Sequence, residues 1–186
     1  MKKNKISFET KFWAGFEAGN AFEAVDAFFD YAHLDYYKQN LIGAVLYSGK
    51  RKIYKLHNPS QLFIFYKAVH SFLKITYCLR KKSRKWKVNN SVRSEKVFHL
   101  SSLTKKEYDN PFLVIEKAFD EQTLGQFDFF LCEIVHLSLS SCSGNSDIDL
   151  LTPFVHLIKM LDALQLMKGR GVEKIQKAIQ IEPLIE

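Results

Sequence analysis

The fold is decided by residues 22–45, FEAVDAFFDYAHLDYYKQNLIGAV, because their pattern returns at residues 112–135 as FLVIEKAFDEQTLGQFDFFLCEIV. The two stretches carry the same residue at six of 24 aligned positions: two Phe, two Leu, one Asp and one Val. Similarity at a fixed spacing is typical of repeated structural units, each with an apolar face that needs a neighbour. The sequence therefore predicts two copies of one unit.

Each copy has apolar residues at helical spacing. In the first, Phe22, Val25 and Phe29 recur three and four residues apart, and two further apolar stretches follow. A helical unit this small cannot cover its own large aromatic side chains, so we expect both units to pack into one bundle. The prediction is an all-α, single compact domain of residues 1–186. Its parts are repeat 1 at 20–79, a basic linker at 80–103, repeat 2 at 104–168 and a tail helix at 171–181.

The apolar positions that the copies share are predicted to form the core. They are Phe22, Phe29, Leu41, Phe65, Phe72, Phe112, Phe119, Leu131, Phe154 and Leu161. Asp30 and Asp120 also recur, and we expect each to cap the helix that follows it. Thr104 and Glu107 have the spacing of a capping box.

Two segments allow a β-hairpin. In the linker, residues 85–88 alternate between cationic and apolar side chains, and residues 97–100 could return as a second strand. Residues 41–57 also fit a hairpin around Ser48-Gly49-Lys50, but the counterpart at 126–137 has no hairpin turn. The repeat therefore favours a helix at 36–47.

Composition excludes several classes of protein. The chain is 47% hydrophobic, and its three cysteines form no CxxC pair, so neither a disulfide framework nor a zinc ribbon is indicated. No charge-free stretch approaches the roughly 20 residues of a membrane span. Sequence motifs of nucleophilic and phosphate-binding sites are absent, and no cofactor is indicated. We expect a cytoplasmic bacterial protein with no membrane association.

Charge is distributed very unevenly. Residues 1–49 hold five basic and six acidic side chains, residues 50–106 hold sixteen and one, and residues 107–186 hold six and thirteen. The three balances are −1, +15 and −7. A basic middle third suits either an external polyanion or the acidic second copy, and both interpretations are open.

The stretch RKKSRKWK at residues 80–87 is the strongest local candidate for a binding site. Its cations could neutralise phosphates while its indole stacks on a base. The alternative is a solvated linker whose indole covers the edge of a helical unit. Cations at residues 50–52 could extend the same surface. The nucleic-acid-binding candidates are Lys50, Arg51, Lys52, Arg80, Lys81, Lys82, Arg84, Lys85, Trp86 and Lys87.

Two further sets of residues suggest weaker sites. Arg93 and His99 resemble the Arg-x(4–6)-His pattern of HEPN-type ribonucleases, which implies phosphodiester chemistry at those two residues. The chain departs from that family at Ser94, where the family has Asn or Asp. Cys132 and His136 have the i, i+4 spacing of metal ligands, but their apolar surroundings favour a core cysteine and a hydrogen-bonded histidine, so no metal site is predicted.

Residues 110–119, NPFLVIEKAF, followed by Leu124 and by DLLTPFVHLIKML at 149–161, resemble uncharacterised bacterial tandem helical-repeat proteins with "NPxxVIxxFF" units. The resemblance implies a helical fold and no assigned activity. The first hypothesis is thus a non-enzymatic interaction or accessory protein, with a protein partner or a second copy bound between the units. The second is a nucleic-acid-binding regulator, and the third a HEPN-like ribonuclease.

Overall fold

The protein is mainly α-helical. The computed structural model describes residues 18–50, 53–54, 60–89, 101–140 and 149–175. The α-helices of that part are α2 (Ala21–Tyr31), α3 (Leu34–Ser48), α4 (Ser60–Arg80), α6 (Lys105–Asp109), α7 (Phe112–Glu121), α8 (Leu124–Leu139) and α9 (Leu151–Arg170). A 3-10 turn, η1 (Ser83–Lys85), and two short strands, β1 (Trp86–Val88) and β2 (Val172–Lys174), complete it.

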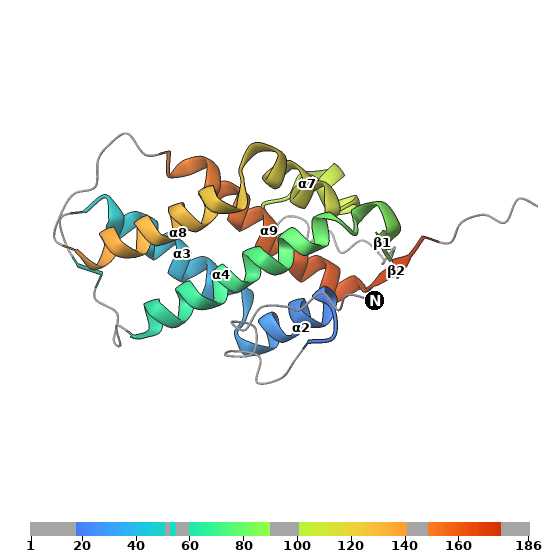
Figure 1. Cartoon of the computed structure of the whole chain (residues 1–186), viewed down its shortest axis with the longest axis horizontal. Helices are drawn as coiled ribbons and strands as arrows, with labels where there is room; N and C mark the ends of the chain where they lie inside the picture. The colour runs from blue at the N-terminus through green and yellow to red at the C-terminus, as the bar shows by residue number, and fades with distance from the viewer. Residues whose placement is uncertain (1–17, 51–52, 55–59, 90–100, 141–148, 176–186) are drawn as a thin grey trace, which may run out of the picture.

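Two long helices, α4 and α9, cross in the middle of the view, and the shorter helices lie around them (Figure 1). Along one half, α3 packs against α8, and both contact α4. Along the other half, α2 and α7 each pack against both α4 and α9. The first helix of each predicted repeat therefore contacts the third helix of both repeats, and neither repeat buries its apolar face alone.

The order and bounds of the helices recur with the spacing that the sequence indicates. Ninety residues separate the ends of α2 and α7, and ninety separate the starts of α3 and α8. Residues 36–47 are helical, so the hairpin interpretation of 41–57 is wrong for that part. A common origin of the two halves stays a prediction, as do the domain boundaries.

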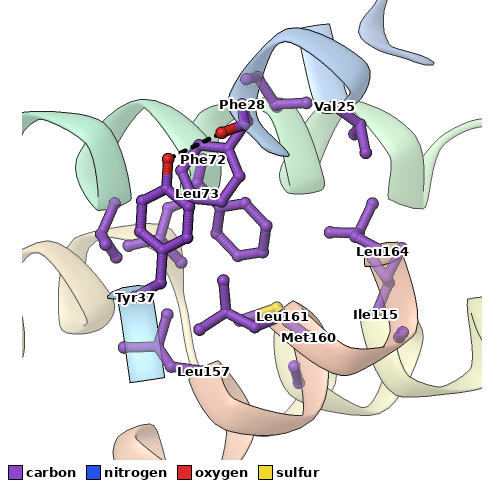
Figure 2. Close-up of a cluster of buried hydrophobic side chains, with 14 of the residues drawn as sticks. Val25, Phe28, Tyr37, Phe72, Leu73, Ile115, Leu157, Met160, Leu161 and Leu164 are labelled. Carbon is purple, nitrogen blue, oxygen red and sulfur yellow. Dashed lines mark hydrogen bonds between the residues drawn. The ribbon is translucent and has the colours of Figure 1, made fainter. Parts of the chain in front are cut away.

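The core is centred on a stack of aromatic side chains from three helices (Figure 2). The Phe28 ring lies 4.0 Å from the Tyr37 ring in a stacked arrangement and 4.7 Å from the Phe72 ring. The Tyr37 hydroxyl donates a 2.7 Å hydrogen bond to the Phe28 carbonyl, which satisfies a polar group that is fully buried. Leu161 of α9 closes this cluster from the other side.

Eight of the ten predicted core residues are buried, and two are only half-buried. Phe22 lies at the edge of the bundle, where its ring is 4.8 Å from the Trp86 ring. Phe154 is the fourth residue of α9, close to the N-terminus of that helix. The periodicity predicted the buried face of each helix correctly. It could not show that a residue near the end of a helix is less buried than one in the middle of the same face.

Local signals explain several helix ends. Thr104 and Glu107 form the predicted capping box at α6. At α9 the Asp149 carboxylate accepts hydrogen bonds from the amides of Leu151 and Thr152, and Pro153 falls in the first turn, where its missing N–H costs nothing. The same helix ends at Gly171, whose φ of 77° suits glycine.

The recurring aspartates Asp30 and Asp120 do not cap the next helix, so that prediction is wrong. The helix after Asp120 is capped by Thr123, and the helix after Asp30 begins at His33 without a side-chain cap. Each aspartate instead forms an ion pair with a cation near the C-terminus of a long helix: Asp120 with Arg80, and Asp30 with Lys168.

The linker strand pairs with the segment after α9. Strand β1 is antiparallel to β2, with Trp86 opposite Lys174 and Val88 opposite Val172. The predicted tail helix is therefore wrong at residues 172–174, because Gly171 turns the chain back along the linker. Residues 97–100, the expected hairpin partner, lie outside the described part.

One described helix, α4, is long and apolar enough to cross a membrane by length and composition. More than half of its apolar window is buried against the other helices, as in the core helix of a bundle.

Candidate functional site

The basic stretch that the sequence singles out winds around the C-terminal end of α4. Backbone bonds from Lys82 to Leu79 (2.8 Å) and from Lys85 to Lys82 (2.9 Å) keep the chain in tight turns after the helix. The Ser83 hydroxyl adds a 3.0 Å bond to the Arg80 carbonyl. Successive cations therefore point in different directions around one end of the helix.

Trp86 has a structural place in this region. Its ring packs 4.8 Å from Phe22 of α2, and the Lys174 ammonium lies 5.6 Å from its centroid. The side chain is half-buried and belongs to the strand that joins β2. The indole thus covers the edge of the helical unit, as the alternative interpretation expected, and the base-stacking role has no support from its position.

Two of the predicted cations are paired with carboxylates. Arg80 pairs with Asp120 of α7, and Lys87 pairs across the strands with Glu173 at 3.0 Å. Carboxylates of the acidic last third of the chain therefore neutralise part of the basic stretch.

Four cations of the stretch have no carboxylate partner within the described residues. Lys81, Arg84 and Lys85 are exposed, and Lys82 is half-buried with its ammonium 5.2 Å from the Phe22 ring. Repulsion among four such charges costs free energy in the isolated protein, and an external polyanion would relieve it.

A hollow of about 370 Å³ lies among these cations and is lined by Tyr77, Arg80, Lys81 and Arg84. Tyr77 precedes Arg80 and Lys81 by three and four residues, so the three side chains share one face of α4. The Lys81 ammonium lies 5.6 Å from the centroid of the Tyr77 ring. Sequence reasoning missed Tyr77 because it sits inside an apolar helix, although its spacing from the cations was a signal.

Lys50 does not extend this surface. Lys50 follows the end of α3, beside the Tyr47 ring. That end of α3 and the C-terminal end of α4 lie at opposite ends of the bundle (Figure 1), separated by the roughly 30 Å length of a 21-residue helix. Arg51 and Lys52 lie outside the described residues.

The weaker candidates receive no support. Arg93 and His99 lie outside the described residues, so the ribonuclease pattern stays a prediction. Cys132 and His136 are both exposed on α8, which corrects the expected core positions. They lie on the outer face because buried Leu131 and Ile134 occupy the inner one. Within the described ranges no cluster of three metal-ligating side chains occurs.

A second cleft, between α7 and α9, contains charged groups that the sequence did not single out. The buried His156 imidazole lies 2.9 Å from the Glu121 carboxylate, as a hydrogen-bonded core histidine should. The Lys159 ammonium donates bonds of 2.9 and 2.8 Å to both oxygens of Glu107. These groups satisfy one another, so the cleft holds two helices together and offers no unsatisfied charge.

The pKa of Glu107 records this arrangement. Burial alone would raise the pKa of the carboxyl, but hydrogen bonds from Lys159 and Thr104 and the charge of Lys159 outweigh burial. The pKa of Glu107 therefore lies below its ordinary value of 4.5, and the carboxylate stays ionised in its pair.

Comparison of the chain with protein-family models, curated proteins and solved structures gave no match.

Proposed function

We propose that the protein binds nucleic acid through the C-terminal end of α4 and the turn that follows it. The observation that carries this proposal is a set of four cations without carboxylate partners among the described residues, Lys81, Lys82, Arg84 and Lys85. Two of them, Lys81 and Arg84, line a hollow together with Arg80 and the Tyr77 ring. Cations scattered over a surface are ordinary. Here the cations are crowded at one helix end, and among the described residues only Arg80 and Lys87 of the stretch are paired with carboxylates. Such a crowd of like charges favours the binding of an external polyanion.

The physical reason is the release of counterions. A nucleic acid carries a condensed layer of cations, and each phosphate that the protein neutralises frees part of it. With about four contacts on a single strand, the logarithm of the affinity should fall with the logarithm of salt concentration with a slope of about −3.

The test is a titration of a fluorescently labelled 20-nucleotide strand, read by anisotropy from 20 to 300 mM salt. The variant Lys81→Gln/Arg84→Gln should bind more weakly, with its salt slope reduced by about one unit. The control Lys50→Gln/Lys67→Gln removes the same charge away from the hollow and should bind like the wild type. Failure of the wild type to bind at 20 mM salt, or equal loss in both variants, would remove the proposal.

A second candidate, an interaction or accessory protein, is favoured by apolar side chains at the opposite end of the bundle. Leu46 and Phe63 are 55% and 59% exposed, where α3 ends and α4 begins. Exposed large apolar groups at one end are typical of contact surfaces. If a second copy binds there, sedimentation velocity should show concentration-dependent association that Phe63→Ser reduces and Leu113→Ser, on α7, does not.

A further inference from the structure

We infer that the hollow at the end of α4 receives one unpaired nucleotide, with its base against Tyr77 and its phosphate among Arg80, Lys81 and Arg84, so that the ligand is single-stranded. This inference rests on the proposed nucleic-acid binding and adds the class of substrate.

The ring of Tyr77 is held in place. Tyr77 is half-buried, and Phe119 of α7 lies 5.2 Å away with its ring plane at 75° to that of Tyr77. That edge contact fixes the orientation of Tyr77 while leaving part of its ring in the wall of the hollow. A ring that is fixed before binding loses little side-chain entropy when a base stacks on it.

Arg80 is fixed as well. Its guanidinium is paired with Asp120, whose carboxylate is 63% exposed. One carboxylate among Arg80, Lys81 and Arg84 leaves a net positive site. The pair also holds one side of the guanidinium, so its other N–H groups are available to a phosphate.

The shape keeps the bases of a duplex out of the hollow. About 370 Å³ lies within the usual range of small-ligand sites, and only part of a nucleic acid can enter it. The bases of a duplex are stacked and paired, so their faces cannot reach an aromatic wall inside a hollow. Unstacked bases of a single strand can, and stacking on an aromatic side chain tolerates any base.

The second half of the chain does not repeat this site. An offset of 89 in the sequence aligns Phe65 and Phe72 of α4 with Phe154 and Leu161 of α9. With this offset Tyr77 and Arg80 correspond to Leu166 and Gly169. Lys81 corresponds to Arg170, which donates a 2.8 Å bond to the Tyr108 carbonyl and lies over the Tyr108 ring. One nucleotide per chain is therefore the expected stoichiometry.

The experiment compares a 12-nucleotide single strand with the 12-base-pair duplex of the same sequence, using wild type, Tyr77→Leu and Tyr77→Phe at 50 mM salt. We expect the wild type to prefer the single strand. Tyr77→Leu should lose about tenfold in single-strand affinity and little in duplex affinity, while Tyr77→Phe, which keeps the ring, should bind like the wild type. A single strand that carries the fluorescent base 2-aminopurine should also lose fluorescence on binding the wild-type protein, because the base stacks on the Tyr77 ring. This measurement needs no variant.

The outcomes separate the two proposals. Equal affinity for single strand and duplex, with Tyr77→Leu binding like the wild type and no change in 2-aminopurine fluorescence, would overturn the single-nucleotide site and leave nucleic-acid binding in place. Binding of anionic lipid vesicles without binding of either nucleic acid would overturn both.

Discussion

Asp120 at the end of α7 forms an ion pair with Arg80 at the end of α4. Ninety residues earlier, Asp30 at the end of α2 pairs with Lys168 in the last turn of α9. In both pairs a carboxylate from the first helix of one predicted repeat meets a cation from the third helix of the other. The recurrence of this aspartate therefore reflects a contact between the two halves and not the start of the next helix.

These two pairs should contribute little to stability. Asp30 and Asp120 are 73% and 63% exposed, so water and salt screen their attraction. We expect Asp30→Asn and Asp120→Asn each to lower the free energy of unfolding by no more than about 1 kcal/mol, and by less at 1 M salt. Urea unfolding followed by circular dichroism measures the difference. A loss that persists at high salt would contradict this account.

The buried Tyr37 hydroxyl should contribute more. Tyr37→Phe leaves the Phe28 carbonyl without its donor, which should cost about 1–2 kcal/mol at pH 7 in urea unfolding. Burial also raises the pKa of Tyr37 far above its ordinary value of 10.0.

That pKa gives Tyr37→Phe a pH dependence with a definite sign. Above pH 10 the unfolded chain releases the Tyr37 proton and the folded chain does not, so the stability of the wild type should fall. The variant lacks this term, and the gap between the two proteins should narrow as pH rises. Tyr47→Phe is the matched control, because Tyr47 lies in the last turn of α3 and is only half-buried. A constant gap up to pH 11 would be inconsistent with the raised pKa.

Glu107 predicts the opposite dependence. Because its pKa is lowered in the folded state, its contribution is present above about pH 4.5 and is lost as pH falls through the folded-state pKa. Glu107→Gln should therefore be less stable than the wild type by about 1–2 kcal/mol at pH 7, with the difference closing as the pH falls through the lowered pKa of Glu107. Thermal unfolding at a series of pH values provides the measurement, with Glu116→Gln as control.

Trp86 should matter for folding and not for binding. Trp86→Leu removes the ring contact with Phe22 and the Lys174 contact, and should lower the free energy of unfolding by about 1–2 kcal/mol. Its single-strand affinity should stay within about twofold of the wild type, since a base-stacking residue would cost more than fivefold. A large loss of single-strand affinity in a folded Trp86→Leu protein would instead indicate that the Trp86 indole stacks on a base.

Helix identity was predictable because its causes lie within a few residues. Phe22, Val25 and Phe29 share a face by spacing alone, and the capping box of Thr104 and Glu107 involves two residues three apart. The linker hairpin stays a prediction, because its second strand lies outside the described residues. The tail helix was wrong at residues 172–174 because strand pairing depends on a partner far along the chain. Lys87 of β1 lies opposite Glu173 of β2, 86 residues later in the chain. Gly171 turns the chain just before β2.

The candidate site was predictable only in part. The sequence identified the cations at residues 80–87, but it also chose Trp86 as the stacking group and joined residues 50–52 to the same surface. Whether a charge is paired depends on which helix lies beside it, and Asp120 and Glu173 come from elements that no local pattern connects with α4. Tyr77 belongs to the candidate site because the turn after α4 places Arg84 in the lining of the same hollow.

By itself, the sequence determined the helices, their order and the faces that they bury, because periodicity and capping act through neighbouring residues. Only the tertiary structure decided which charges cancel, which aromatic ring lines a hollow and which end of a 21-residue helix carries the free cations. Electrostatic and packing energies depend on the distance between groups in space. These properties were therefore decided by contacts between segments that are remote in the chain.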